Sequence, residues 1–488
     1  MNKGEVAFVG AGPGDVKLIT VRGQELLRAA DVVLYDRLVH PLLLEETQPE
    51  AERIYCGKLP DRHHLRQETI QEILIEKAQQ GKRVVRLKGG DPGVFGRVGE
   101  ETSALDEASI SYEVVPGITS GIAAATYAGV PVTHRDYSTS FTVVTGHSKE
   151  AAGVPAPDWA DLAAGSETIA FYMGVKNLPT ISRELLSHGK PADTPVLIIE
   201  WGTTGRQRTV EGTLATIVDT ATTASVQNPA ITLVGEVCSL RNGTSWYEEK
   251  LHLGRVICFV PSRDSARTEE LLRPLQEEGA EVLSFPQEVA APLPVPSGFW
   301  DQVYAASSLS FLEKESVVRF FDEMRAAGLD VRSLPGRISV PVGAEGVSDA
   351  LYARGITNIE NSKERFRLDE VVVGSEAIET AAVFWRSHEW RPDTRGRNTL
   401  DRLVREEWLN TVIVESPEGA YRLKEEVETL LGQSLAVFLA DKDVLALTEE
   451  AADVLAEEGG YAVLGTSAEI SGQLHSMAKV REKAMVSV

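Results

Sequence analysis

The segment from Val84 to Glu101 is the part of the chain whose residue types and spacing point most directly to chemistry. An apolar run, Val84 to Leu87, leads into a glycine-dense turn that carries acidic residues and an arginine. Glycine lets a backbone approach a ligand closely and adopts positive φ readily. Open α/β sheets bind ligands at the ends of their strands. The segment therefore predicts a ligand-binding loop directly after a buried strand.

A second glycine loop, Gly10-Ala11-Gly12-Pro13-Gly14-Asp15, follows an apolar run at 5–10. It resembles a dinucleotide-binding loop, but its glycines do not have the G-x-G-x-x-G spacing. Pro13 also lacks the backbone N–H that a phosphate site would use. Asp31 or Asp36 could serve as a ribose-binding acid. The loop by itself is compatible with a nucleotide-like ligand and with a plain tight turn.

Strands that alternate with helices must position these loops, which indicates a parallel α/β sheet. We expect a first lobe that ends near Gly117 and a second lobe that begins at Thr119. In the first lobe we expect strands at 5–10, 32–35 and 83–87 and helices at 20–30 and 65–80, with Gly81 as a C-cap. In the second lobe we expect strands at 141–145, 168–172, 196–200 and 230–234.

The pattern starts again after a linker at 251–254. Strands are expected at 256–260, 281–285, 411–414 and 434–439, and helices at 265–278, 418–430 and 446–458. The proline-rich stretch 287–298 reads as a loop, and 386–400 fits no element. The chain is therefore predicted to hold a second α/β unit after the linker.

Chain length, net charge and residue composition limit the kinds of protein that this chain can be. A chain of 488 residues predicts two or three domains, and its net charge of −23 argues against nucleic-acid binding. The N-terminus lacks a basic-plus-apolar leader, and no apolar run is long enough to span a bilayer. The scattered Cys56, Cys238 and Cys258 form no CxxC and indicate buried thiols in a reducing cytosol. We therefore expect a cytoplasmic protein without a membrane partner.

No metal site is expected, because the histidines lack the spacing of metal ligands. The histidines considered are His63, His64, His134 and His147.

Several blocks occur in a fixed order along residues 4–250. Besides the two glycine loops, they are Asp31–Asp36, Val115–Ser120, Ala128–Arg135, Tyr172–Gly174 and Gly202–Thr204. Together they resemble the tetrapyrrole methylases, and most closely the uroporphyrinogen-III C-methyltransferases. A domain of this family is thus expected over residues 1–250.

The resemblance implies that S-adenosylmethionine lies between two α/β lobes and that the protein is a homodimer. It places the cofactor-binding residues at Pro13, Gly89, Gly90, Asp91, Val94, Thr119, Ser120, Met173 and Gly202. The chain departs from the usual family pattern at Gly93, Val94 and Val98, and Trp201 stands where Gln is common. Val94 remains a branched apolar side chain that can pack the site.

The resemblance also implies the catalytic residues. Asp36 is the candidate proton acceptor, Lys58 the candidate proton donor, and Arg97 and Glu100 the substrate contacts. Structural alternatives stay open, because Asp36 could cap a turn, Lys58 could be a surface lysine and Arg97 could pair with a neighbouring glutamate. The substrate carries many carboxylates, and arginine binds carboxylates bidentately. Basic residues near the motifs are Arg37, Lys58, Arg62, Arg66, Arg97 and Arg135.

The remainder of the chain, 254–488, resembles the uroporphyrinogen-III synthases. Its opening strand and helix, the segment Leu334–Gly343 and the turn Val412–Ala420 carry the resemblance. That family has two α/β lobes with a cleft between them and cyclises hydroxymethylbilane to uroporphyrinogen III. An active synthase and a degenerate, structural domain both stay open. Candidate binding residues are Ser262, Arg263, Ser307, Ser308, Ser416 and Tyr421.

The combined prediction is a bifunctional α/β enzyme. It would methylate uroporphyrinogen III at C2 and C7 to give precorrin-2, with S-adenosylhomocysteine as the second product. One alternative is a methylase of a later corrin intermediate. Another is a nucleotide-binding regulatory protein with an inactive C-terminal domain.

Overall fold

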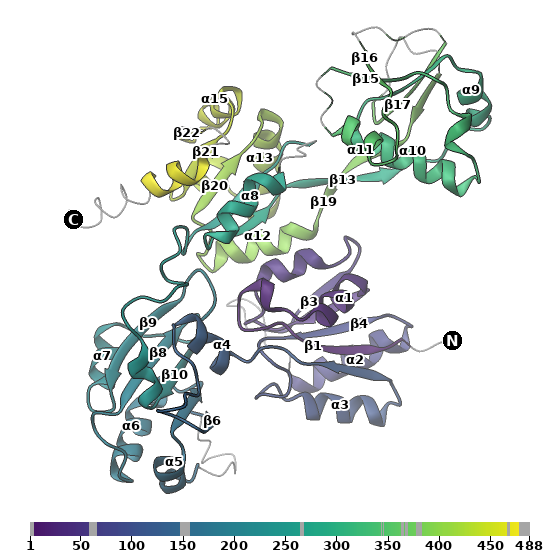
Figure 1. Cartoon of the computed structure of the whole chain (residues 1–488). Helices are drawn as coiled ribbons and strands as arrows, with labels where there is room; N and C mark the ends of the chain where they lie inside the picture. The colour runs from purple at the N-terminus through teal and green to yellow at the C-terminus, as the bar shows by residue number, and fades with distance from the viewer. Residues whose placement is uncertain are drawn as a thin grey trace.

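The structure is a computed structural model that describes residues 4–57, 66–146, 157–263, 268–342, 344, 346–362, 366, 369–376, 383–465 and 469–477. These residues fold as an N-terminal half (4–250) and a C-terminal half (254–477), each built of two α/β lobes (Figure 1). In the described residues no helix is long and apolar enough to cross a membrane.

The first lobe is a parallel sheet with strand order β3-β2-β4-β1-β5. Side chains alternate across the sheet, so Ala7 and Val9 pack beneath α1 and η2 while Val6 and Phe8 pack beneath α2 and α3. The predicted strands and helices are confirmed, and Gly81 follows α2 with a φ of 81°. Its elements are β1 (Val6–Gly10), α1 (Val21–Ala29), β2 (Val32–Tyr35), η2 (Pro41–Glu46), β3 (Glu52–Tyr55), α2 (Gln67–Gln79), β4 (Val84–Lys88), α3 (Val98–Glu107) and β5 (Tyr112–Val115).

The second lobe is a mixed sheet with strand order β6-β7-β10-β8-β9. Among these described strands only β6 and β7 pair in parallel, and the other pairings are antiparallel. The predicted strands are present, and an edge strand, β9, was not predicted because its residues are largely polar. The elements are α4 (Ser120–Tyr127), β6 (Phe141–Thr145), α5 (Trp159–Gly165), β7 (Thr168–Tyr172), α6 (Leu178–Ser187), β8 (Pro195–Glu200), β9 (Arg208–Thr213), α7 (Ile217–Thr223) and β10 (Ala230–Val234).

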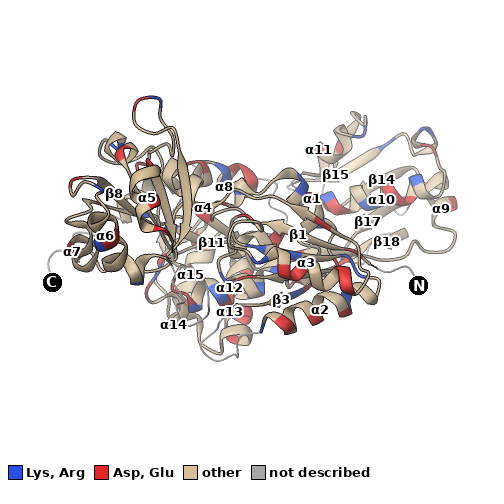
Figure 2. Ribbon diagram, turned by 90° about the horizontal axis from the view of Figure 1, so that it is seen from below, with Lys and Arg blue, Asp and Glu red and all other residues tan. Residues whose placement is uncertain are grey.

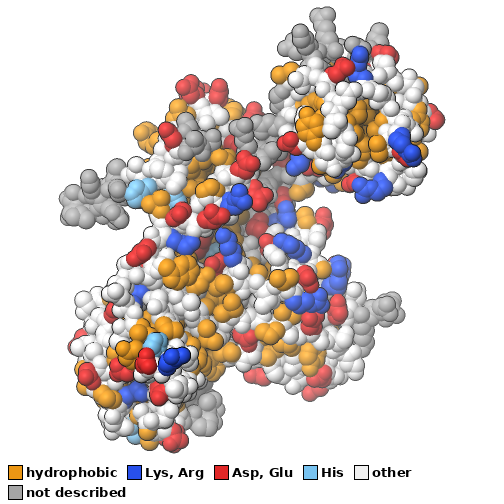
Figure 3. Space-filling model, in the orientation of Figure 1, with side chains coloured by type: hydrophobic (Ala, Val, Ile, Leu, Met, Phe, Trp, Pro, Cys, Tyr) orange, Lys and Arg blue, Asp and Glu red, His pale blue; other side chains and the backbone are white. Residues whose placement is uncertain are grey.

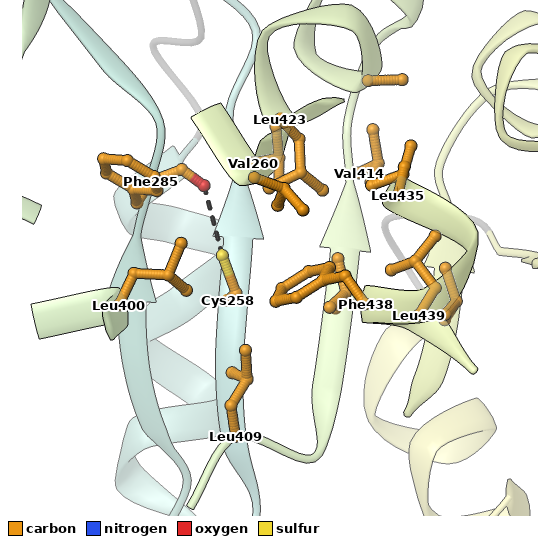
Figure 4. Close-up of a cluster of buried hydrophobic side chains, with 14 of the residues drawn as sticks. Cys258, Val260, Phe285, Leu400, Leu409, Val414, Leu423, Leu435, Phe438 and Leu439 are labelled. Carbon is orange, nitrogen blue, oxygen red and sulfur yellow. Dashed lines mark hydrogen bonds between the residues drawn. The ribbon is translucent and has the colours of Figure 1, made fainter. Parts of the chain in front are cut away.

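The third lobe is a parallel sheet with strand order β12-β11-β20-β21-β22. Its core packs Cys258, Phe285 and Phe438 between the sheet and the helices on one face, and the Cys258 thiol donates to the Phe285 carbonyl at 3.3 Å (Figure 4). The elements are β11 (Val256–Val260), α8 (Thr268–Glu277), β12 (Glu281–Ser284), α12 (Arg395–Arg405), β20 (Thr411–Val414), α13 (Pro417–Leu431), α14 (Leu435–Leu439), β21 (Asp443–Ala446), α15 (Glu449–Glu457) and β22 (Val463–Leu464).

The fourth lobe is a parallel sheet with strand order β16-β15-β14-β17-β18, and its core contains Phe299, Phe320 and Trp385. Its elements are α9 (Phe299–Ala305), β14 (Ser308–Phe311), α10 (Lys314–Ala326), β15 (Ile338–Pro341), α11 (Val347–Tyr352), β16 (Ile359–Ser362), β17 (Glu370–Gly374) and β18 (Val383–Arg386).

An antiparallel ribbon, β13 (Gln287–Pro292) with β19 (His388–Asp393), joins the third and fourth lobes (Figure 1). The expectation of a loop at 287–298 is therefore wrong for the first part of that stretch. The unassigned stretch 386–400 forms the end of β18, then β19 and the start of α12. The strand predicted at 434–439 is also wrong, since those residues form α14 with Ser434 as its N-cap.

The cysteines are buried, as expected. Cys56, Cys238 and Cys258 are free thiols, each at most 3% exposed. Burial raises the pKa of Cys258 to about 12 and that of Cys56 to about 11. These thiols are therefore protonated, unreactive core residues at neutral pH.

The two halves contact each other where α12 lies against η2 of the first lobe. Figures 1 and 2 show α12 beside that lobe. Thr399 donates a hydrogen bond to the Glu45 carboxylate at 2.6 Å. His40 Nε2 lies 3.0 Å from the Glu281 carboxylate, and both side chains are largely buried. Figure 3 shows charged side chains gathered at this junction on the face that it draws.

Candidate functional site

Three loops meet at the carboxyl ends of the parallel strands β1, β4 and β5. Gly12 and Gly90 exchange backbone hydrogen bonds of 3.2 Å and 2.7 Å. A Cβ at Gly10 would lie 2.5 Å from the Gly117 nitrogen, and a Cβ at Gly117 would lie 2.2 Å from the Gly90 carbonyl oxygen. Only glycine permits this spacing. The predicted glycine loops are therefore brought together into one backbone surface.

Asp91 fastens two of these loops. One carboxylate oxygen accepts from the Gly93 N–H at 2.7 Å, and the other accepts from the Gly117 N–H at 2.9 Å. A Cβ at Gly89, two residues before Asp91, would lie 3.2 Å from that of Leu38. These contacts bring the turn after β2, which carries Asp36, next to the glycine loops.

The second lobe supplies the opposite side of the site. The Thr119 hydroxyl lies 2.6 Å from the Tyr172 hydroxyl, which also accepts from the Gly121 N–H at 2.6 Å. The Phe95 ring lies 5.2 Å from the Tyr172 ring, so the loop after β4 packs on β7. Met173, the next residue, is 42% exposed.

The loop Gly202–Thr204 closes the junction between the lobes. The Asp15 N–H donates to the Thr203 hydroxyl at 3.1 Å, which ties this loop to the first glycine loop. A Cβ at Gly202 would lie 2.5 Å from that of Ala124, so α4 packs directly against it. Tyr127, at the end of α4, donates to the Asp15 carboxylate at 2.8 Å.

Strained backbone is concentrated on these loops. Among the described non-glycine residues with positive φ, five belong to them: Phe95, Arg97, Met173, Trp201 and Thr203. Such conformations cost about 1–3 kcal/mol each and collect at functional sites. The strain marks the junction between the two N-terminal lobes as the candidate site.

A buried network of charges lies beside Asp36. Arg86 donates to the Asp36 carboxylate at 2.6 Å and to Glu101 at 3.2 Å, and Lys88 donates to Glu101 at 2.6 Å. The Glu101 side chain is fully buried, whereas Asp36 is 34% exposed. Burial and the neighbouring Arg86 lower the pKa of Lys88 below its usual value, although Glu101 opposes this shift. Asp36 is thus held by a fixed cation and stays open to solvent.

Arg97 and Glu100 form a bidentate pair at the start of α3. The Arg97 Nε donates to Glu100 at 2.9 Å, and both side chains are more than half exposed. The hydrogen bond to Arg97 lowers the pKa of Glu100 below its usual value. An exposed pair of this kind is worth about 0–1 kcal/mol, so a carboxylate ligand could replace Glu100 at Arg97.

The remaining predicted cofactor-binding and basic residues make fewer contacts that fix their side chains. Pro13, Ser120 and Val94 are partly buried on the loops already described, and Val94 packs on the core of the second lobe. Three of the predicted basic residues are exposed, namely Arg37, Arg66 and Arg135. Lys58, Arg62, His63, His64 and His147 lie outside the described residues. In the described residues no group of three His, Cys, Asp or Glu side chains could hold a metal ion.

In the C-terminal half the weak candidates are mostly engaged by the protein itself. Ser416 caps α13 by accepting from the Gly419 N–H at 3.1 Å, and Ser308 is buried. The Ser262 N–H donates to Glu415 at 2.7 Å. Arg263 pairs with Glu288 at 2.9 Å, Ser307 is exposed and Tyr421 is 52% exposed.

Comparison with known proteins identifies the family. The profile of the Tetrapyrrole (Corrin/Porphyrin) Methylases matches residues 5–218. A uroporphyrinogen-III C-methyltransferase of Bacillus subtilis (strain 168) is 42% identical over 421 residues, which is 85% of each chain. The chain belongs to the tetrapyrrole methylase family. A methylase of Priestia megaterium, also a uroporphyrinogen-III C-methyltransferase, is 56% identical over 234 residues, covering 48% of this chain and 98% of that protein.

Other relatives extend past the methylase half. The porphyrin biosynthesis protein HemD of Ruminiclostridium josui is 40% identical over 348 residues, covering 71% of this chain and 68% of that protein. Alignments of this length include part of the C-terminal half. Among solved structures, a uroporphyrin-III C-methyl transferase from Thermus thermophilus, complexed with S-adenyl homocysteine, is 38% identical. It covers 49% of this chain and 100% of that chain, with a TM-score of 0.43.

Within the methylase half, the sequence reasoning missed the roles of Arg86, Lys88 and Glu101. Arg86 and Lys88 alternate with apolar residues on β4, a strand that is buried throughout. A charged side chain on a buried strand requires a partner, because charges are seldom fully buried unless they are paired. That signal predicts a buried carboxylate near β4, but it does not identify Glu101.

Proposed function

We propose that this chain transfers methyl groups from S-adenosylmethionine to uroporphyrinogen III, at C2 and C7, to give precorrin-2. The observation that carries the proposal is the match to a uroporphyrinogen-III C-methyltransferase, 56% identical over 98% of its length. The alternative of a later corrin substrate is less favoured, because the relatives from Bacillus subtilis and Priestia megaterium carry the name of the earlier enzyme.

The loops at the lobe junction fit this cofactor. They bring together the backbone of Gly89 and Gly90, the side chains of Thr119 and Ser120, and the exposed Met173. A nucleoside linked to an amino acid needs such donors, acceptors and apolar surface. Pro13, Asp91, Val94 and Gly202 would complete the binding surface. When bound there, the cofactor supplies an electrophilic methyl group.

The protein's own residues then have two tasks. They align the nucleophilic pyrrole carbon with the methyl group, which is catalysis by proximity. They also accept the proton that this carbon loses, and Asp36 is suited to that role because Arg86 orients its carboxylate while solvent still reaches it. Lys58 remains the proposed proton donor.

Substrate carboxylates require cations near Asp36. Arg37 adjoins it in sequence, and Arg97 is held by an exposed glutamate that a substrate could displace. Arg97 and Glu100 are therefore proposed as substrate contacts, with the arginine fork binding a carboxylate and Glu100 released from it.

The proposed assembly is a homodimer through the methylase half. Large apolar side chains are exposed along β5 and the start of α4, at Tyr112, Val114, Ile118 and Ile122. Hydrophobic side chains that gather on a surface mark interaction sites. A second copy of the chain is the proposed occupant.

Synthase activity in the C-terminal half is the second candidate function. Two parallel α/β lobes joined by the β13–β19 ribbon favour it. The pairing of Glu288 with Arg263 at 2.9 Å and with Arg422 at 3.5 Å weighs against it, because a polyanionic bilane would need those cations.

One coupled assay tests both activities. The full chain is given S-adenosylmethionine with either hydroxymethylbilane or uroporphyrinogen III, and products are followed by absorbance and mass. Dimethylated product from uroporphyrinogen III is the expected result, and its absence contradicts the methyltransferase proposal. Dimethylated type-III product from hydroxymethylbilane without added synthase would show that both halves are active.

A further inference from the structure

The C-terminal half contacts the two methylase loops that carry Asp36 and Gly202. On the Asp36 side, the buried Arg402 guanidinium of α12 donates to the Val39 carbonyl at 2.8 Å and also to the Arg37 carbonyl. These carbonyls belong to the turn that begins at Asp36, where the Val39 N–H donates to the Asp36 carbonyl at 3.2 Å. Arg402 therefore clamps the turn through its backbone.

On the Gly202 side the contacts are aromatic and charged. The Trp201 and Trp408 rings pack edge to face with centroids 5.3 Å apart, and the Arg206 guanidinium lies over both rings at 4.6 Å and 5.2 Å. Trp408 is 4% exposed. Trp201 stands where glutamine is common in the family, and its ring packs on a tryptophan of the other half.

Glu281 connects the two contact regions. Its carboxylate accepts from the Gly205 N–H at 2.6 Å, just after the Gly202 loop, and lies 3.0 Å from His40, just after the Asp36 turn. One buried side chain of the C-terminal half thus contacts the residues that directly follow both loops of the methylase site.

These loops need external support. Trp201 and Thr203 have φ values of 47° and 71°, a region that non-glycine residues occupy only when their surroundings hold them. A displacement of about 1 Å in a positioning group can reduce a rate about 100-fold. Support of the loops by the fused half therefore bears directly on methyl transfer.

Building on the proposed methyltransferase function, we infer that the C-terminal half is a positioning element of the methylase site. Arg402 positions Asp36 through the turn backbone, and Trp408 positions the Gly202 loop. Methyl transfer then depends on the C-terminal half whether or not that half has synthase activity.

Single substitutions in the full chain test this inference. Arg402→Ala should lower kcat for methylation of uroporphyrinogen III about 10- to 100-fold with little change in KM for S-adenosylmethionine. Arg402→Lys, which keeps a donor, should restore part of kcat. Trp408→Ala should raise the Kd for S-adenosylhomocysteine about 5- to 10-fold in calorimetry, and Trp408→Phe should have a smaller effect.

Two control variants separate an effect on loop positioning from a general destabilisation of the contact between the halves. Thr399→Ala removes contacts between the halves at Pro41 and Glu45 of η2, after the Asp36 turn, and Arg405→Ala changes an exposed arginine on the same helix. Both should keep wild-type kcat and Kd. Thermal melts are recorded for every variant, and the variants of Arg402 and Thr399 are compared at matched folded fraction.

The outcomes distinguish the two proposals. Wild-type kinetics and binding in the Arg402 and Trp408 variants would overturn the positioning role, as would an equal loss of kcat in Thr399→Ala. A wild-type chain that binds S-adenosylhomocysteine but does not methylate uroporphyrinogen III contradicts the proposed substrate, and the Trp408 binding comparison still decides the Gly202 contact. A wild-type chain that binds no S-adenosylhomocysteine overturns both proposals.

Discussion

Single residues at this site divide into those that stabilise the loops and those that remain accessible. Asp91 uses both carboxylate oxygens on backbone N–H groups, whereas Asp36 keeps a partly exposed carboxylate beside a buried arginine. An accessible, oriented carboxylate suits proton transfer, and a fully engaged one suits loop architecture.

Asp36→Asn tests the proton-acceptor role. The amide keeps an oxygen to which Arg86 can donate, so the fold and cofactor binding should be retained. Turnover of uroporphyrinogen III should fall about 100-fold or more, the usual contribution of a general base. Steady-state kinetics with calorimetry of S-adenosylhomocysteine binding measure both quantities, and unchanged turnover would remove Asp36 from the mechanism.

Neighbouring glutamates on α3 provide a matched test of the buried network. Glu101→Gln leaves Arg86 and Lys88 with a neutral partner in the interior and should lower the free energy of unfolding by about 3–5 kcal/mol. Glu100→Gln, next in sequence but exposed, should change it by less than about 0.5 kcal/mol. Urea denaturation compares them, and a loss for Glu101→Gln as small as that for Glu100→Gln would mean that the buried network adds no more stability than an exposed pair.

At the scale of elements, the site depends on loops whose backbones lie too close together to leave room for a side chain between them. The loops after β1, β4 and β5 are separated by distances that exclude a Cβ at Gly10 or Gly117. The sheet topology brings them together, because parallel strands end at one edge.

Gly117→Ala should therefore disturb the loops and weaken S-adenosylhomocysteine binding by about 10-fold or more, since its Cβ would meet the Gly90 backbone. Gly99→Ala on α3 is the control, because a Cβ there meets nothing within 4 Å. The control should bind normally and melt at the same or a slightly higher temperature. Normal binding by Gly117→Ala would show that the loops can separate without loss of function.

The ribbon that joins the C-terminal lobes has its own stabilising contact. Burial by itself would raise the pKa of Glu313, the N-cap of α10, but hydrogen bonds from His388 and Ser375 lower it to about 2. A lowered carboxylate pKa contributes stability that is complete above the unfolded value near 4.5 and is lost as the pH falls toward 2.

Glu313→Gln should accordingly reduce the free energy of unfolding at neutral pH by about 2–3 kcal/mol. The difference between variant and wild type should narrow as the pH decreases from 4.5 toward 2. Urea titrations at several pH values measure this, and a difference that does not vary with pH would exclude the ionised carboxylate as its source.

At the scale of the whole molecule, the chain combines a proposed dimer surface on one half with a contact between halves that reaches the methylase loops. These surfaces are separate in sequence, at β5–α4 and at η2–α12. Dimerisation and loop positioning can therefore be perturbed independently.

Ile122→Glu should convert the proposed dimer to monomer, because it places a charge within an apolar surface. Val342→Glu, at a still more exposed apolar residue in the C-terminal half, should leave the mass unchanged. Light scattering after size exclusion gives the mass, and a wild-type monomer would contradict the proposed assembly.

The sequence by itself determined most strands of the sheets and the residues of the glycine loops. Buried parallel strands are short apolar runs, and glycines are required wherever backbones meet, so both signals are local. A local signal also gave a wrong prediction. The apolar run Leu435–Leu439 is as compatible with a helix as with a strand, and in the structure it forms the helix α14. Only the tertiary structure decided the pairing of β13 with β19, the partners of Arg86 on β4, and the contact of Arg402 with the Asp36 turn. Each of these joins residues far apart in the chain, and their partners are selected by burial and hydrogen bonding in three dimensions, which spacing along one sequence does not encode.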